Sequence, residues 1–407
     1  MSGLLDVRLD IGGERLKVGR LAWRDRRSLF EFDAKFVDRG LPLSPLRLPL
    51  APGVQMAPRE PFGGLFGVFA DSLPDSYGRL LLDRRLRATG RDPNALTPLD
   101  RLALVGEQGF GALRFAPTDN LDVEPASITD LDRLQTEALA VIAGEPSELL
   151  AMLQQLGGSA GGARPKAQVW LSERSDRIAT QPTPGNEPWL VKFRAPTDPD
   201  DIGAIEAAYA CMAMAAGIEV APYRLLPSQI GPGHFASRRF DRDESGPLHL
   251  HSLAGLLEAD PDGASVSYRE YLRVTQFLTR DARMVAAAFR RMVFNVAAHN
   301  RDDHARNHAF LMNAAGQWTL SPAFDLTFAP GPGGEHYLAI AGEGRAVSRD
   351  HLIAEGRTAG LSLKLLEACI DEVRTAVADW PKFAKTAGVT AARTSEIHAA
   401  ITSASAV

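Results

Sequence analysis

Apolar and charged residues alternate with a period of two near the start of the chain. The alternation runs over residues 5–11, a pair of glycines follows, and the pattern continues over residues 16–18 and 29–36. Alternate side chains of a strand point to opposite faces, and paired glycines are typical of a turn. Residues 4–36 are therefore predicted to form short antiparallel strands.

Helix signals replace this alternation further along the chain. The sequence Ser-Leu-Pro-Asp at residues 72–75 is typical of a helix start, because proline fits the first helical turn. A second short helix is expected over residues 96–105 and a strand over residues 110–115. Residues 1–118 are therefore predicted to form a small α+β module.

A linker rich in Asp, Pro and Ser follows this module. Residues 127–130, Ser-Ile-Thr-Asp, are a variant of the capping box and predict the start of a helix. Residues 119–245 combine strand and helix signals. Residues 246–407 are predicted to be mainly helical, with an apolar stripe at helical spacing over residues 282–298.

Composition and charge describe an ordinary globular protein. The 407 residues suggest two or three domains, and 45% of them are hydrophobic and 23% charged. A net charge of −5 does not favour bulk attraction to nucleic acid or to anionic membranes. Two cysteines, Cys211 and Cys369, are too few for a disulfide framework and fit a reducing compartment. Because no basic segment and apolar core open the chain, a cytoplasmic protein is expected.

A glycine-rich segment precedes a strand in the middle of the chain. Residues 157–166 read Gly-Gly-Ser-Ala-Gly-Gly-Ala-Arg-Pro-Lys, and residues 167–171 are predicted to form the strand. Glycines let backbone N–H groups approach a ligand closely, and successive amides form a nest for anions. The segment does not match the Walker pattern, since no Gly-Lys-Ser/Thr opens a helix. It is therefore either a flexible turn or a cradle for phosphate.

A lysine interrupts the next apolar strand, Trp-Leu-Val-Lys-Phe at residues 189–193. Lys192 lies either on the solvated face of an edge strand or buried against an anion, and the neighbouring glycine-rich segment favours the second interpretation. Glu206 occupies the first half of a helix predicted over residues 201–216. It is either an exposed helical acid or the partner of Lys192.

The densest polar segment of the chain is residues 299–308, His-Asn-Arg-Asp-Asp-His-Ala-Arg-Asn-His. It lies between the apolar runs 292–298 and 310–312. Acids, amides and imidazoles at this density would be costly to bury without partners or a ligand. The segment is interpreted as a metal-and-phosphate site, and the alternative is a solvated loop between a helix and a hairpin.

Two spacings in this region agree with the needs of phosphoryl transfer. Asp302 and Asn307 are five residues apart, like the base and the metal-binding Asn of a protein-kinase catalytic loop. Asp325 follows a predicted hairpin, as the metal-binding Asp of a kinase does, although Phe-Asp-Leu stands here in place of Asp-Phe-Gly. The oxygen atoms of these side chains suit Mg²⁺.

A series of short motifs runs through the whole chain. In order they are Phe30-Glu-Phe-Asp33, Pro42-Leu-Ser44, Ser72-Leu-Pro-Asp75, Leu104-Val-Gly106, Gly111-Ala-Leu113, Gly158-Ser-Ala-Gly-Gly-Ala-Arg-Pro-Lys166, Leu190-Val-Lys-Phe193, Arg239-Phe-Asp-Arg242, Asn300-Arg-Asp-Asp-His-Ala-Arg-Asn307 and Leu320-Ser-Pro-Ala-Phe-Asp325. The series resembles the HipA family of bacterial serine/threonine kinase toxins. The resemblance implies an α+β, two-lobed protein-kinase-like fold. A HipA-like amino-terminal module would cover residues 1–118, an N-lobe-like region residues 119–245, and a mainly helical C-lobe residues 246–407.

The same resemblance implies the roles of the polar residues around 302. Asp302 would be the catalytic acid/base that orients a substrate hydroxyl, with Asp303 as its competitor for that role. His304 would support the loop close to ATP. Asn307 and Asp325 would coordinate Mg²⁺. His299 and His308 would be structural.

The resemblance also implies which residues bind ATP. Lys192 would hold the α- and β-phosphates. The glycine-rich loop would cradle the phosphates through Gly161, Gly162, Ala163, Arg164 and Lys166. A hinge beside adenine would consist of Arg238, Arg239 and Phe240, with a backbone contact only at Arg238. Ser159 would be an autophosphorylated serine, because a phosphate there would bring roughly two negative charges into the loop that embraces ATP and lower the activity.

Partners and substrates follow from the resemblance alone. The antitoxin would be a small helix-turn-helix protein of the HipB type, and DNA would be bound through that complex. The protein substrate would be an aminoacyl-tRNA synthetase, such as glutamyl-tRNA synthetase, whose phosphorylation would arrest translation and growth.

Three alternatives remain at this stage. A metal-dependent hydrolase would use the ligand-like set His299, Asp302, Asp303, His304 and His308, but it leaves Lys192 and the glycine-rich segment unexplained. A non-catalytic scaffold for the antitoxin would not need the full set of polar residues. A small-molecule kinase of similar fold would not need Ser159 or the amino-terminal module.

Overall fold

The computed structural model describes residues 3–119, 121, 130–157, 162, 164–172, 178–260 and 266–403 of the chain. The amino-terminal module contains a five-stranded antiparallel sheet with strand order β4-β3-β2-β1-β5. Its strands are β1 (Leu4–Ile11), β2 (Glu14–Arg24), β3 (Arg27–Phe32), β4 (Val54–Met56) and β5 (Leu113–Ala116). Val7 and Leu9 are wholly buried, so the alternation at the start of the chain correctly predicted one buried face.

Two boundaries in this module differ from the prediction. The end of the segment 29–36, expected to be strand, belongs to α1 (Ala34–Arg39), because the Asp33 carboxylate accepts a hydrogen bond from the Lys35 amide and caps a helix there. Helix α3 (Ser76–Ala88) begins after Asp75, so Pro74 precedes the helix and does not lie in its first turn. The remaining elements of the module are α2 (Gly67–Ala70), η1 (Pro93–Ala95) and α4 (Pro98–Val105).

A second five-stranded sheet forms the N-lobe, with strand order β7-β6-β8-β10-β9. Its strands are β6 (Lys166–Ser172), β7 (Ile178–Ala179), β8 (Asn186–Lys192), β9 (Tyr223–Leu226) and β10 (His234–Arg238), and its helices are α5 (Leu131–Ala143), α6 (Leu150–Gly157) and α7 (Ile202–Ala215). The helix predicted from the capping-box motif at residues 127–130 is present and ends at Ala143, as expected, while Ser127 itself lies outside the described residues. The N-cap of α5 is Asp130, whose carboxylate accepts hydrogen bonds from the amides of Asp132 and Arg133.

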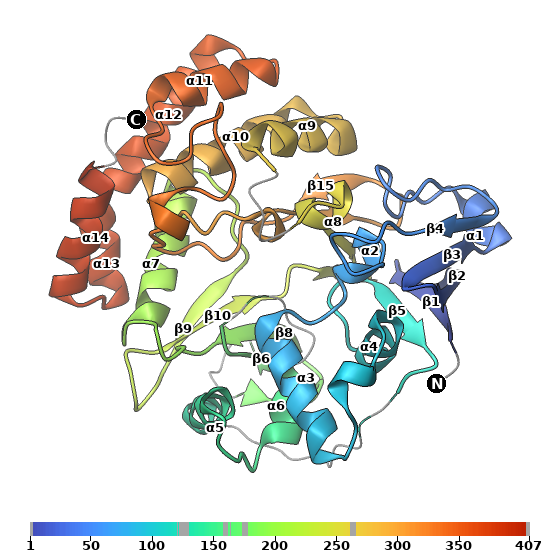
Figure 1. Cartoon of the computed structure of the whole chain (residues 1–407). Helices are drawn as coiled ribbons and strands as arrows, with labels where there is room; N and C mark the ends of the chain where they lie inside the picture. Colours follow the sequence, from blue (N-terminus) through green and yellow to red (C-terminus); the bar gives the residue numbers. More distant parts are fainter. Residues whose placement is uncertain are drawn as a thin grey trace.

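The C-lobe is mainly helical, as predicted. Its helices are α8 (Leu253–Leu257), α9 (Tyr268–Thr279), α10 (Ala282–Ala297), η2 (Ala305–Asn307), η3 (Pro332–Gly334), α11 (Arg349–Thr358), α12 (Leu363–Ala378), α13 (Trp380–Ala387) and α14 (Ala391–Ser403). Two small sheets accompany them, β11 (Arg242–Asp243) with β12 (Gly246–Pro247), and β13 (His249–Ser252) with β14 (Ala309–Met312) and β15 (Trp318–Leu320). Helices α11–α14 and the amino-terminal strands lie at opposite ends of the molecule (Figure 1). Within the described chain, no helix combines the length and the apolarity that crossing a bilayer requires.

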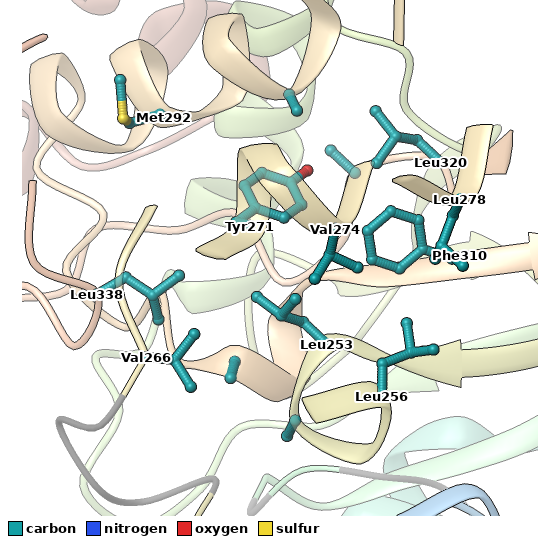
Figure 2. Packing of buried hydrophobic residues seen from close by; sticks show 14 of the residues in the cluster. Leu253, Leu256, Val266, Tyr271, Val274, Leu278, Met292, Phe310, Leu320 and Leu338 are labelled. Atoms are coloured by element: carbon teal, nitrogen blue, oxygen red, sulfur yellow. The ribbon is translucent and has the colours of Figure 1, made fainter. Parts of the chain in front are cut away.

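Two apolar clusters hold these parts together. The larger cluster joins the amino-terminal sheet to the C-lobe, and Figure 2 shows its centre, where Leu253, Tyr271 and Phe310 come from α8, α9 and β14. The smaller cluster joins Tyr77 and Leu81 of α3 to helices α5 and α6 and to the N-lobe sheet. The amino-terminal module therefore packs against both lobes, and its α3 is part of the N-lobe core.

A buried polar network connects the module to the C-lobe. The His251 Nδ1 atom lies 2.6 Å from an oxygen of Asp71, and its Nε2 atom lies 2.9 Å from the Ser44 hydroxyl. Ser252 donates to Asp71 through its amide and its hydroxyl, each at 2.7 Å. Burial alone would raise the pKa of Asp71, but the hydrogen bonds from His251 and Ser252 hold it below its usual value. Each buried polar group is thus satisfied by the other domain.

The contact between α2 and α8 is close enough to require glycine. A Cβ atom on Gly67 would lie 2.1 Å from the carbonyl oxygen of Gly255. Gly67→Ala is therefore expected to lower the free energy of unfolding by about 2 kcal/mol, measured by urea denaturation, although glycine to alanine normally stabilises a helix. Gly231→Ala is the control, because its Cβ would meet no atom closer than 3.8 Å. Equal effects of the two variants would contradict this account of the interface.

Candidate active site

Two lysines from neighbouring strands form the floor of the site. In the antiparallel pair of β6 and β8, Lys166 lies directly opposite Lys192. Both side chains are largely buried. Lysines are seldom buried unless they have anionic partners, and like charges directly opposite each other destabilise a sheet. The strand register therefore creates a concentrated positive charge that requires anions nearby.

Lys192 meets two of these anions. Its Nζ atom lies 3.1 Å from Glu206 Oε2 and 2.6 Å from Asp325 Oδ1. Glu206 is buried on α7, so the interpretation as an exposed helical acid was wrong. Burial alone would lower the pKa of Lys192, but Asp325 and Glu206 raise it above its usual value. Lys192 therefore stays charged at neutral pH, although it is buried.

Asp325 is held in this place by its backbone. The residue has a φ of 53°, a left-handed conformation that costs a non-glycine residue ~1 kcal/mol. The preceding segment is anchored by the Ala323 amide, which donates to the carbonyl of Glu219 at 2.8 Å. Burial by itself would raise the pKa of Asp325, but Lys192 and Lys166 hold it far below its usual value. Asp325 is therefore ionised throughout the physiological range.

Arg164 and Lys166 come from the carboxyl-terminal end of the glycine-rich segment. Arg164 forms ion pairs with Glu206 at 2.9 Å and with Asp198 at 3.2 Å. Gly162 has a φ of 93°, and a Cβ atom there would lie 2.5 Å from the Nζ atom of Lys166. Burial lowers the pKa of Lys166, against the attraction of Asp325. The positive φ of Gly162 thus favours glycine at this position, and the Lys166 ammonium lies close to it.

The polar segment 299–308 faces this cationic floor from the C-lobe. The Asp302 side chain is 52% exposed, and its carboxylate accepts no hydrogen bond from any described residue. Partial desolvation raises the pKa of Asp302, with Asp325 acting in the same direction and His304 and Arg164 against it. The His304 ring lies 3.9 Å from the carboxylate. Asp302 is thus an unengaged carboxylate at the mouth of the site.

Asp303 differs from Asp302 in its burial, in its hydrogen bonds and in the direction of its pKa shift. Its side chain is fully buried and accepts hydrogen bonds from the Tyr268 hydroxyl at 2.7 Å and from the Tyr337 amide at 2.9 Å. A ring nitrogen of His336 lies 2.8 Å away. Burial alone would raise the pKa of Asp303, but the hydrogen bond with His336 holds it below its usual value. The geometry therefore assigns Asp303 to the support of the loop and leaves Asp302 as the acid that can reach a substrate.

Asn307 connects the two ends of this loop. Its Nδ2 atom donates to the backbone carbonyl of Asp302 at 2.8 Å. Its side-chain oxygen makes no hydrogen bond within the described part of the chain. Asn307 and Asp325 thus offer an amide oxygen and a carboxylate, which are the ligands that Mg²⁺ prefers.

The imidazoles do not form a metal centre with the acids. Among residues 3–403, apart from the gaps given above, no three His, Cys, Asp or Glu side chains converge on a common point that would hold a metal ion. Burial lowers the pKa of His299 to about 4 and that of His308 to about 4. The His308 ring packs against Tyr271 with centroids 4.4 Å apart, and the His299 ring stacks on Phe328 at 5.5 Å. Both rings therefore have the packed environment of structural residues. A Mg²⁺ ion held by two protein oxygens and by nucleotide phosphates needs no larger ligand set, so the residues present fit that ion.

The predicted hinge lies at the end of β10. The backbone amide of Arg238 donates to Pro222 at 2.8 Å, and that of Arg239 donates to Pro188 at 3.0 Å. The Arg238 side chain pairs with Glu187 at 3.0 Å. The Arg239 guanidinium is buried, pairs with Asp241 and stacks over Phe110 of the amino-terminal module with 4.0 Å to the ring centroid. These two amides are therefore not available to adenine, and Arg239 fastens the hinge to the module.

Phe240 completes the hinge by packing its ring against Phe324, the residue before Asp325, at 5.3 Å between centroids. The predicted residues Ser159, Gly161 and Ala163 lie outside the described residues. Among the described ones, the structure brings Arg164, Lys166, Lys192, His304 and Asp325 together with Asp302 and Asn307 around one site.

Sequence reasoning missed three charged residues of the site. Asp198 binds Arg164, and Asp75 accepts a hydrogen bond from the Gly162 amide at 2.6 Å and forms an ion pair with Arg306. The motif Ser-Leu-Pro-Asp was interpreted as a helix start and as part of the family resemblance, and neither interpretation placed Asp75 at the site. Its distance of 87 residues from Gly162 left no local signal.

Comparison with known proteins follows the same division of the chain. Residues 9–116 match the protein-family model of the HipA N-terminal domain, and residues 158–380 match that of the HipA-like C-terminal domain. A protein of Sinorhizobium fredii named putative kinase Y4dM is 26% identical over 381 residues, which are 87% of this chain and 85% of that protein. HipA of Shewanella oneidensis, solved with HipB and its operator DNA, has a similar fold, with a TM-score of 0.69 and 18% identity over 99% of this chain and 96% of that one.

Substitution by alanine should affect the free energy of unfolding very differently at the adjacent acids Asp302 and Asp303. Asp303→Ala is expected to lower the free energy of unfolding by about 3 kcal/mol, because it leaves buried donors unpaired. Asp302→Ala should change it by less than about 0.5 kcal/mol, because it removes a half-exposed carboxylate that accepts no hydrogen bond from the described residues. Urea denaturation of both purified variants measures the difference. A loss of stability shared equally between them would contradict the assignment.

Proposed function

Because this chain belongs to the HipA family, we propose that it is an ATP- and Mg²⁺-dependent serine/threonine protein kinase that acts as the toxin of a toxin–antitoxin pair. The observation that carries the proposal is the position of the Lys192 ammonium between Glu206 and Asp325. Protein kinases need a lysine paired with a helical glutamate, next to a metal-binding aspartate. Three separate segments of the chain supply the lysine, the glutamate and the aspartate here.

The chain's own residues would divide the reaction among them. Lys192, Lys166 and Arg164 provide fixed positive charge for the phosphates of ATP, and such preorganised charge is the main source of catalysis in phosphoryl transfer. Asn307 and Asp325 would hold Mg²⁺, which would neutralise phosphate charge when bound. Asp325 is also the ion-pair partner of Lys192, so the residue that would hold the metal lies directly beside the lysine that would hold the phosphates.

Asp302 would act on the acceptor hydroxyl. Its carboxylate would accept a hydrogen bond from the serine or threonine hydroxyl, orient the oxygen toward the γ-phosphate and take up the proton as the new bond forms. The raised pKa of Asp302 makes its carboxylate a stronger base than that of an ordinary aspartate. The hydrogen bond from Asn307 to the Asp302 carbonyl fixes the loop that carries it.

Regulation and partners extend the proposal. A phosphate on Ser159 would compete with those of ATP for the same cations, so autophosphorylation there would limit the activity. The Shewanella relative was solved with HipB and operator DNA. By analogy, this chain would bind a HipB-like helix-turn-helix antitoxin and reach DNA through it. An aminoacyl-tRNA synthetase, such as glutamyl-tRNA synthetase, would be the protein substrate.

Two variants test the nucleotide site directly. Lys192→Ala and Asp325→Asn are expected to lower phosphate transfer from radiolabelled ATP by roughly a thousand-fold, because each removes a charge that acts on the phosphates or on Mg²⁺. Lys364→Ala is the control, because this lysine is exposed on α12, far in sequence from the site. Thermal unfolding of each variant checks that the fold is retained. Transfer at the parental rate by Asp325→Asn would overturn the metal assignment.

The substrate can be identified in cells. After brief induction of the chain, quantitative phosphosite mapping of the host proteome should show new phosphoserine or phosphothreonine on an aminoacyl-tRNA synthetase and on Ser159. Asp302→Asn should abolish both signals, because it removes the proposed base. Growth arrest that is equally strong with Asp302→Asn would favour the non-catalytic scaffold instead.

A further inference from the structure

Asp75 is the N-cap residue of α3, yet it does not cap the helix. An N-cap aspartate usually accepts a hydrogen bond from an amide of the first turn, and losing that bond costs ~1 kcal/mol. The first turn of α3 is fully described, and the Asp75 side chain makes no such bond. Its carboxylate turns instead toward the active site, where Oδ2 accepts from the Gly162 amide at 2.6 Å and Oδ1 pairs with Arg306.

The two partners of Asp75 belong to different lobes. Gly162 lies in the glycine-rich segment of the N-lobe, directly above the Lys166 ammonium. Arg306 lies in η2 of the C-lobe, between Asp302 and Asn307. The carboxylate is 17% exposed and the Arg306 side chain 29%, so solvent screens this pair only in part. A single side chain of the amino-terminal module thus connects the phosphate cradle to the loop that carries the proposed base.

The same helix also contacts the start of the glycine-rich segment. A Cβ atom on Gly157 would lie 3.2 Å from the Tyr77 ring and 3.3 Å from Leu81. Tyr77 and Leu81 belong to the apolar cluster that includes α6 and β6, which flank the segment in sequence. Helix α3 therefore holds the segment by packing at Gly157 and by a charge-assisted hydrogen bond at Gly162. Such bonds are roughly twice as strong as neutral ones.

We propose that Asp75 is a positioning residue for phosphoryl transfer, supplied by the amino-terminal module, which holds the Gly162 amide over the nucleotide site and Arg306 beside the catalytic loop. This inference rests on the proposed function for its effect on catalysis. It makes the module a component of the active site. A partner that displaces α3 would therefore change nucleotide binding without touching the nucleotide site.

The two contacts of Asp75 can be separated by substitution. Asp75→Ala removes both, whereas Asp75→Asn keeps a neutral acceptor for the Gly162 amide and loses the charge that holds Arg306. Asp75→Ala is expected to weaken ATP–Mg²⁺ binding, measured by calorimetry on the full chain, by roughly ten-fold and to speed hydrogen exchange in peptides that contain Gly162. Asp75→Asn should restore most of the affinity and the exchange protection, while turnover of saturating ATP stays roughly ten-fold low in both variants.

Two further variants complete the experiment. Asp38→Asn is the control, because Asp38 is an exposed acid of the same module, on α1. The double variant Asp75→Ala with Arg306→Ala should turn over ATP no more slowly than Asp75→Ala alone, since residues that act through one contact are not additive. A merely structural role would lower the melting temperature in parallel with activity and would not separate affinity from turnover.

Three outcomes would overturn the inference. The first is that Asp75→Ala leaves both the ATP–Mg²⁺ affinity and the hydrogen exchange unchanged. The second is that Asp75→Ala turns over ATP faster than the parent, which would mean that the contact blocks the site. The third is that the control Asp38→Asn has the same effects as Asp75→Ala. Hydrogen exchange separates this inference from the proposed function. If the parent chain bound no ATP, the proposed function would fail, yet faster exchange around Gly162 in Asp75→Ala would still support the contact, and its absence would refute it.

Discussion

Buried positive charge is the constraint on which the rest of this structure depends. The register of β6 and β8 places Lys166 opposite Lys192 inside the protein, and an unpaired buried ammonium would cost several kcal/mol. Anionic partners must therefore be supplied from elsewhere in the fold. Glu206 comes from α7 and Asp325 from the segment after β15, and the backbone of Asp325 accepts a left-handed conformation to reach its place. The candidate site is therefore a cluster in which buried lysines and carboxylates from separate segments compensate one another's charge.

The amino-terminal module takes part in this arrangement and is not an appendage. Its sheet shares an apolar core with the C-lobe, its α3 belongs to the core of the N-lobe, and Asp71 satisfies buried polar groups across the interface. Arg239 stacks on Phe110 behind the hinge, and Asp75 spans both catalytic loops. Because these contacts are buried or partly buried, solvent and salt screen them less than they would screen exposed ion pairs. The module thus contributes contacts to the candidate site as well as to the two apolar clusters.

The two adjacent acids of the catalytic loop show how environment separates residues of the same type. The Asp303 carboxylate is fully buried and is hydrogen-bonded to Tyr268, Tyr337 and His336. Asp302 has no such partners, and its side chain is half exposed. The hydrogen bonds of Asp303 fix the position of the loop that carries Asp302, because a fully satisfied buried network makes its surroundings rigid. The spacing to His304 and Asn307 favoured Asp302 as the catalytic acid, which stays a prediction, and the hydrogen bonds show that Asp303 is the acid already engaged by the fold.

Local pattern was sufficient for the elements and for the residue types of the site. Period-two alternation predicted the first strands and helical spacing predicted α10, because these signals depend on near neighbours in the chain. The kinase-like fold was implied by the resemblance of the motif series to a known family. Only the tertiary structure decided which partner each charged side chain meets. Whether Lys192 was solvated or paired, whether Glu206 was exposed, and which of two acids was free all depended on segments more than ten residues away. Asp75 is the clearest case, since its local signal was that of a helix cap and its actual partners are 87 and 231 residues distant.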